Sequence, residues 1–167
     1  MILFAYASNM DVTRFAESVP SAKKIGIAHL PGHRFEFSKT ADDDSSKSNI
    51  TLSKTDPTES VWGVLIAIDD NERHNFYDPN TWSTGLKLEP VNCVDEQGEI
   101  YKAEAFFAQH HAMSAHVLPY DWYHKKIILL AEKAGLPAEY IQKISLLPFK
   151  VDPDEKRRAK RLKKLGL

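Results

Sequence analysis

The stretch Val61-Trp62-Gly63-Val64-Leu65-Ile66-Ala67-Ile68 decides which fold this sequence can adopt. A run of apolar residues rich in β-branched side chains is typical of a strand buried at the centre of a sheet. Just before it, residues 50–53 alternate apolar and polar side chains, and the pair Asp56-Pro57 indicates a turn between the two segments. We therefore predict that residues 50–53 and 61–68 form neighbouring antiparallel strands.

Further strands are expected on both sides of this centre. Residues 2–6 form a short apolar run that ends at the small polar residues of a tight turn, and residues 33–38 alternate as a half-buried strand does. Residues 86–94 and 100–108 flank a turn composition and predict a hairpin. The polar, serine-rich residues 40–49 predict an exposed and mobile loop.

Helices are expected mainly in the last third of the chain. The longest helical pattern starts near Tyr120 and stops at Gly135, with a second helix over residues 138–146. Shorter helical turns are predicted after Asp11 and over residues 69–76. Strands followed by helices indicate an α+β domain with mostly antiparallel pairing.

Length and composition fit one domain. The chain has 167 residues, of which 43% are hydrophobic, enough for one core and too few for two ordinary domains. We assign residues 1–150 to this domain and residues 151–167 to a basic C-terminal tail. The apolar runs are too short to cross a membrane, and the first residues resemble a strand more than a signal peptide, so we expect a cytoplasmic protein.

Charge gives little indication of a macromolecular partner. The formal net charge is -1, from 22 basic and 23 acidic residues, so the molecule as a whole has no bias toward nucleic acid or anionic lipid. The tail concentrates lysine and arginine, which would suit an RNA or another anionic surface. Because no aromatic residues are interleaved with these charges, we expect a solvated tail and no nucleic-acid partner.

Histidine and cysteine give no strong indication of a chemical site. His110, His111 and His116 lie close together, but their spacing fits no zinc pattern, so we expect exposed loop histidines and no metal site. Cys93 is the single cysteine of the chain, and we interpret it as a packing residue because no basic cluster near it in sequence would stabilise a thiolate.

Several motifs, in the right order, resemble those of the gamma-glutamylcyclotransferase family. The stretch Phe4-Ala5-Tyr6-Ala7-Ser8-Asn9-Met10 is similar to that family's Tyr-Gly-Ser-Asn loop, and Val61-Trp62-Gly63-Val64 is similar to its Val-Trp-Gly-Val strand. The resemblance covers residues 2 to about 147, and the remaining matching segments are Arg14, Pro20-Ser21-Ala22, Tyr123-His124-Lys125-Lys126-Ile127-Ile128, Gly135-Leu136-Pro137 and Tyr140. It implies an α+β fold, a mostly antiparallel sheet or small barrel with C-terminal helices, and no cofactor.

The resemblance also implies a substrate site. Tyr6, Ala7, Ser8 and Asn9 would hold a gamma-glutamyl group through amides and side chains, and Tyr123 would face it. Tyr6 could instead end its strand with the hydroxyl in water, and Tyr123 could simply belong to the apolar stripe of its helix. Ala7 stands where the family has glycine, which is tolerable only if the backbone there is in an ordinary region.

One departure from the family concerns the catalytic residue. Counting from Val61, the family's glutamate falls on Asn80. In the reaction that the family performs, a carboxylate moves a proton from the substrate's attacking amine to its leaving amine. A carboxamide cannot titrate, and losing a general acid/base typically costs roughly 10²–10⁴-fold in rate. Asp78, or Glu72 earlier in the chain, could supply the missing carboxylate.

Three functions therefore stay open. The protein could be an enzyme (an acyltransferase or lyase) that releases 5-oxoproline from gamma-glutamyl amines or peptides. It could be a pseudoenzyme that binds a gamma-glutamyl-like or other carboxylated ligand without turnover. Thirdly, the tail could recruit a partner. The expected partner is a small molecule, and the sequence leaves a homodimer open.

Overall fold

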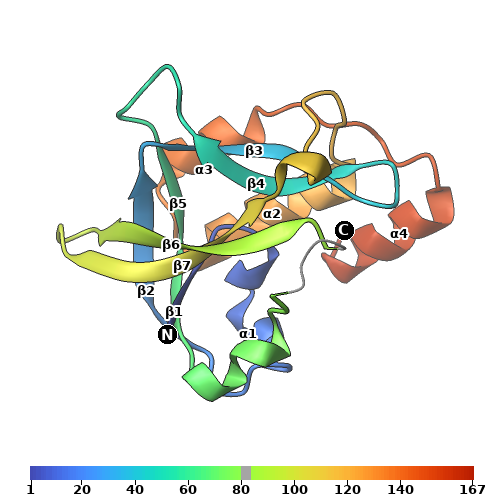
Figure 1. Ribbon diagram of the computed structural model, residues 1–167. Helices are drawn as coiled ribbons and strands as arrows, with labels where there is room; N and C mark the ends of the chain where they lie inside the picture. Colours follow the sequence, from blue (N-terminus) through green and yellow to red (C-terminus); the bar gives the residue numbers. More distant parts are fainter. Residues whose placement is uncertain (80–83) are drawn as a thin grey trace.

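The computed structural model describes residues 1–79 and 84–167. Strands fill the first two thirds and helices the last third (Figure 1). The strands are β1 (Ile2–Ala5), β2 (Lys23–Pro31), β3 (His33–Thr40), β4 (Ser46–Leu52), β5 (Ser60–Ala67), β6 (Leu86–Asp95) and β7 (Ile100–Ala108). The α-helices are α1 (Val12–Phe15), α2 (Asp121–Ala134), α3 (Ala138–Ser145) and α4 (Glu155–Lys164), with 3₁₀ turns η1 (Ser8–Met10), η2 (Asp70–Asn75) and η3 (His110–Ala112).

A closed barrel with strand order β1-β5-β2-β6-β7 forms the body of the molecule. The pairs are antiparallel except where β7 closes the barrel on β1. The predicted α+β fold, a small barrel with C-terminal helices, is thus confirmed. As predicted, β5 is central and its residues from Val64 to Ile66 are fully buried.

The predicted pairing of residues 50–53 with residues 61–68 is wrong. Strand β5 lies between β1 and β2, whereas β4 pairs with β3 in a separate two-stranded sheet. β2 is a strand that the sequence pattern did not reveal. Its first half is exposed and carries a bulge between Lys24 and Gly26, so it lacks the alternation that marks a half-buried strand.

The expected mobile loop at residues 40–49 is also wrong. Most of it belongs to the β3–β4 hairpin, and Ser45, Ser46, Ser48 and Asn49 are buried. Asn49 shows how one of these polar residues can lie inside. Its amide donates to Ser38 Oγ at 3.0 Å and accepts from the Ala108 backbone N–H at 2.9 Å, so burial leaves these groups hydrogen-bonded.

The predicted helices are confirmed, together with the hairpin of β6 and β7. Helix α2 ends where Gly135 takes a left-handed conformation with φ 79°, and α3 follows directly. Asp11 caps α1 by accepting a hydrogen bond from the Arg14 backbone N–H. None of the helices in the described part of the chain has the length and apolar content needed to cross a bilayer.

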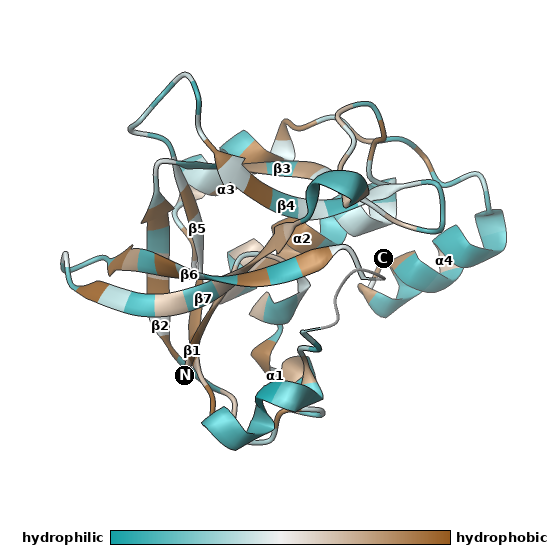
Figure 2. Cartoon of the chain, viewed as in Figure 1, coloured by the Kyte–Doolittle hydropathy of each residue, from teal (hydrophilic) through white to brown (hydrophobic). Residues whose placement is uncertain are grey.

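The C-terminal segment is held more firmly than its sequence indicates. Helix α4 is hydrophilic along most of its length (Figure 2) and has no buried residue. It is nevertheless fixed to α2 by polar contacts, because the buried carboxylate of Asp152 accepts from Trp122 Nε1 at 2.8 Å and from the Arg157 guanidinium at 2.6 and 2.7 Å. The expectation of a merely solvated tail is therefore wrong, while the domain boundary at residue 150 stays a prediction.

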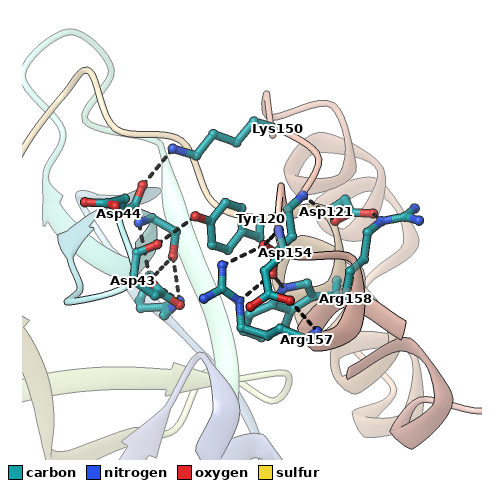
Figure 3. A network of polar contacts seen from close by, with 12 residues as sticks. Asp43, Asp44, Tyr120, Asp121, Lys150, Asp154, Arg157 and Arg158 are labelled. Atoms are coloured by element: carbon teal, nitrogen blue, oxygen red, sulfur yellow. Dashed lines mark hydrogen bonds and ion pairs between the residues drawn. The ribbon is translucent and has the colours of Figure 1, made fainter. Parts of the chain in front are cut away.

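The start of α2 and the residue before the C-terminal segment contact the tip of the β3–β4 hairpin (Figure 3). The Tyr120 hydroxyl donates to the Asp43 carbonyl oxygen at 2.7 Å, and Lys150 Nζ donates to the Asp44 carbonyl oxygen at 2.6 Å. Arg158 adds a bond to Asp121 at 2.8 Å. Hairpin, α2 and C-terminal segment thus form one connected polar network.

Cys93 and the three clustered histidines lie in different environments. Cys93 is fully buried in β6, and burial raises the pKa of its thiol to about 12. His110, His111 and His116 are exposed. Among the described residues there is no group of three or more histidine, cysteine or acidic side chains that could hold a metal ion.

Asp152→Asn should lower the free energy of unfolding by about 2 kcal/mol, because a buried acceptor of two charge-assisted hydrogen bonds loses its charge. The exposed Asp42→Asn is the control and should change stability by less than about 0.5 kcal/mol. Chemical denaturation at pH 7 measures both, and equal values for the two variants would contradict the role given to Asp152.

The ion pair of Asp152 and Arg157 also makes the free energy of unfolding depend on pH. Hydrogen bonds from Arg157 lower the pKa of Asp152 to about 2. In the unfolded chain the pKa of an aspartate is about 3.9. The stabilisation by the ionised Asp152 is therefore complete above that pH and is lost as the pH falls toward 2. Asp152→Asn should therefore flatten the stability profile in this acidic window.

Candidate functional site

A cavity of about 350 Å³ opens beside the end of β1. The cavity is lined by the end of β1, the amino-terminal loop (residues 6–9), the β3–β4 hairpin, residues 76–78, the start of β6, β7 and α2. The described residues that line it are Phe4, Ala5, Tyr6, Ala7, Ser8, Asn9, Lys39, Lys47, Ser48, Phe76, Tyr77, Asp78, Thr84, Leu86, Phe106 and Tyr123.

The amino-terminal loop turns into the short η1 helix. Ala7 has φ -135°, outside the left-handed region, so its methyl group causes no strain of the kind that would require glycine. The Met10 and Asp11 amides bond back to the Ala7 and Ser8 carbonyl oxygens. The Ser8 and Asn9 amides have no acceptor among the described residues, as is usual for the first amides of a helical turn.

Tyr6 lies inside the protein. Its hydroxyl donates to the Phe106 carbonyl oxygen at 2.6 Å, and burial raises the pKa of Tyr6 far above its ordinary value. The alternative in which the hydroxyl faces water is therefore wrong. Tyr6 joins the loop to β7 as a neutral hydrogen-bond donor.

Tyr123 reaches the cavity from the first turn of α2. Its hydroxyl donates to Ser48 Oγ at 3.2 Å and accepts from the Ser48 backbone N–H at 3.3 Å. The ring is buried and packs edge-on against Phe37. Both interpretations of Tyr123 thus describe the same side chain, which packs in the core and also lines the cavity.

Among the charged side chains of the described lining, lysines outnumber carboxylates. Lys39 and Lys47 line it, and Lys126 Nζ lies behind the loop, where it donates to Ser8 Oγ at 3.2 Å. Burial lowers the pKa of Lys126, and the neighbouring Arg14 adds to this effect. Because Ser8 accepts from Lys126, its own hydroxyl proton can be donated toward the cavity.

Lys47 is held in place by its neighbours. Its ammonium is 3.0 Å from Asp43 Oδ2 and 2.7 Å from Ser45 Oγ, and it lies 5.0 Å from the ring centroid of Tyr123. Burial lowers the pKa of Lys47, against the opposing effect of Asp43. Burial opposes the ionisation of Asp43, yet hydrogen bonds from Ser45 and Lys47 lower the pKa of that carboxyl below its usual range.

The two carboxylates suggested as substitutes for the missing glutamate are in different places. Asp78 lines the cavity, and among the described lining residues it is the one carboxylate. Glu72 lies away from the cavity lining and accepts from Ser21 Oγ at 2.6 Å and from the Ser21 backbone N–H at 2.9 Å. Asn80 lies outside the described residues, so its position stays a prediction from the sequence.

Sequence reasoning missed the lysines of the hairpin. Lys39 and Lys47 fall in or beside a segment whose polar composition predicted a loop, and Phe76, Tyr77 and Phe106 gave no signal beyond ordinary apolar patterning. One signal was available. Two lysines flank the acidic turn residues of the segment nearly symmetrically, as cross-strand partners in a hairpin do.

Comparison with known proteins supports the sequence resemblance. Human gamma-glutamylcyclotransferase is 22% identical over 149 residues, which cover 87% of this chain and 78% of that protein. A solved gamma-glutamyl cyclotransferase structure aligns with a TM-score of 0.79 and 22% identity over 98% of both chains. A yeast gamma-glutamyl cyclotransferase specific to glutathione aligns with a TM-score of 0.62 and 11% identity, over 87% of this chain and 93% of that one. No family model matches the sequence.

These similarities define the fold. The barrel with its C-terminal helices is the gamma-glutamyl cyclotransferase fold. The chain is similar in sequence to the human gamma-glutamylcyclotransferase, as its motifs indicated, and it shares the fold of the solved cyclotransferase.

Gly85 lies between two residues that line the cavity, Thr84 and Leu86, and a substitution there tests how closely this part of the chain packs against Ala112. Gly85 has φ 68°, and a Cβ built on it would lie 2.3 Å from Ala112 Cβ. Gly98 is a matched control because it has φ 84° but no heavy atom within 4 Å of such a Cβ. Gly98→Ala should cost about 1 kcal/mol of stability from backbone strain alone.

Gly85→Ala should cost more than Gly98→Ala by about 1–3 kcal/mol, because overpacking adds to the strain. Thermal or denaturant unfolding of the two variants measures the difference. Equal losses would show that Ala112 does not pack tightly against this position.

Proposed function

We propose that the protein converts gamma-glutamyl amines or peptides into 5-oxoproline and a free amine. The observation that carries the proposal is that the amino-terminal loop and the carboxylate of Asp78 line the same cavity. A cavity of about 350 Å³ lies within the range of ordinary small-molecule sites. Its cationic lining suits a substrate that carries a carboxylate.

The loop supplies the groups that hold the glutamyl part. The Ser8 and Asn9 amides begin the η1 turn, and successive N–H groups in a turn can bind a carboxylate. The Ser8 hydroxyl adds a donor that Lys126 orients. Tyr6 and Tyr123 close the sides of the site, and their hydroxyls are already bonded within the protein.

We assign both proton transfers of the reaction to the carboxylate of Asp78. The substrate's alpha-amine attacks the gamma-carbonyl carbon, so that a carbon–nitrogen bond closes the five-membered lactam while the bond to the leaving nitrogen breaks. The carboxylate takes a proton from the attacking nitrogen and delivers a proton to the leaving nitrogen. No proton or electron is gained or lost overall, and no cofactor is required.

Asp78→Asn should lower kcat/KM for a gamma-glutamyl amino acid by roughly 10²–10⁴-fold and leave ligand affinity nearly unchanged, because the carboxamide cannot carry a proton. Formation of 5-oxoproline measures turnover, and calorimetry measures affinity. Glu72→Gln is the control, since Glu72 bonds to Ser21 and is absent from the cavity lining. Wild-type turnover that survives in Asp78→Asn would contradict the role of Asp78.

A second candidate function is a binding module without turnover, and the presence of asparagine at position 80 favours it. In that case the wild-type protein binds gamma-glutamyl compounds and releases no 5-oxoproline. Asn80→Glu should then create activity from a silent background, because it restores a group that can titrate. The same assay separates the two functions, since robust wild-type turnover excludes the binding module.

A further inference from the structure

Lys39 and Lys47 face each other directly across the β3–β4 hairpin, and both line the cavity. Residues directly opposite in an antiparallel pair have their Cβ atoms about 4.5–5.5 Å apart, and like charges in this arrangement are destabilising. Both side chains are half-buried, where water screens the repulsion less than it does at the surface. The hairpin therefore holds two positive charges together at some cost to its stability.

Neighbouring charges compensate this pair only in part. Asp43 balances Lys47, whereas the ammonium of Lys39 has no hydrogen bond or ion pair with a described residue. Arg157 and Arg161 on α4 add further positive potential at Lys47. Asp78 is the one acidic residue of the described lining. An excess of positive charge thus stays on the hairpin side of the cavity.

Lys47 is also preorganised to bind a ligand. Asp43 and Ser45 accept from its ammonium, and the rings of Trp122 and Tyr123 lie at 5.1 and 5.0 Å from it. An ammonium has three donors, so one N–H beyond these two partners can point to a ligand. A fixed ammonium loses little conformational entropy when an anion binds, which increases affinity.

We propose that Lys39 and Lys47 form a subsite for an acidic group on the part of the ligand that leaves as the amine. The proposal rests on the proposed function, in which the amino-terminal loop holds the glutamyl part. The lysines come from a different element, the hairpin, so they are available to the remainder of the ligand. Two adjacent cations suit a group with more than one negative charge, such as a second carboxylate or a phosphate ester. The preferred ligands are accordingly gamma-glutamyl derivatives of acidic amines.

The test compares isosteric ligands that differ in charge. Calorimetry would measure gamma-glutamyl-aspartate against gamma-glutamyl-asparagine, and gamma-glutamyl-O-phosphoserine against gamma-glutamyl-serine. The wild-type protein should bind the acidic member of each pair at least about 10-fold more tightly, as a charge-assisted hydrogen bond predicts. The two pairs distinguish a carboxylate from a phosphate as the better group.

Variants test whether the two lysines cause the preference for the acidic ligands. Lys39→Met and Lys47→Met should each reduce it, and the double variant should abolish it while binding the neutral ligands as the wild type does. Lys47→Arg should keep most of the preference, and Lys54→Met, at an exposed position, should leave it unchanged. Equal wild-type affinity for the paired ligands, or a preference that survives the double variant, would overturn the proposal.

Two further measurements separate this proposal from the proposed function and from misfolding. If no gamma-glutamyl compound binds, the proposed function fails, and titration with inorganic phosphate and succinate tests the subsite alone. Binding that the double variant loses supports the subsite, and no binding overturns it. Lys39→Met should unfold at the same temperature as the wild type or a few degrees higher, because it relieves repulsion.

Discussion

The close approach of β1 to β5 at Gly63 is the constraint on which the structure depends. A side chain at this position would lie 2.6 Å from the Ala5 carbonyl oxygen and 2.9 Å from the Phe4 ring. The absence of a Cβ lets β1 pair with the fully buried centre of β5. Because the amino-terminal loop begins immediately after Ala5, the same contact fixes where this loop leaves the barrel and therefore where the cavity forms.

Polar contacts join the elements around the site. Asn49 ties β4 to β3 and β7, and Tyr120 ties the start of α2 to the tip of the hairpin. The C-terminal segment then fixes α2 through the buried carboxylate of Asp152. The tyrosines of the cavity are oriented by hydrogen bonds to residues far apart in the sequence, whereas Lys47 is held by its near neighbours Asp43 and Ser45.

The sequence predicted the elements with regular patterns and missed those without. Strand β5 and helix α2 were predicted because a continuous apolar run and a helical stripe each persist over many residues. Strand β2 was missed because a bulge and an exposed half interrupt its alternation. Residues 40–49 of the β3–β4 hairpin do not show as strands in the sequence, because the partners of the buried Ser48 and Asn49 include Tyr123 and Ala108, which lie far along the chain.

By itself, the sequence determined the class of fold, the amino-terminal loop and the substitution of asparagine at position 80, because each depends on residues that are neighbours along the chain. Only the tertiary structure decided that Asp78, and not Glu72, lines the cavity, and that Lys39 lies opposite Lys47. It also decided that the basic C-terminal segment is docked on α2. The physical reason is that charge pairing and desolvation depend on distances in space, and strand register and helix docking set these distances.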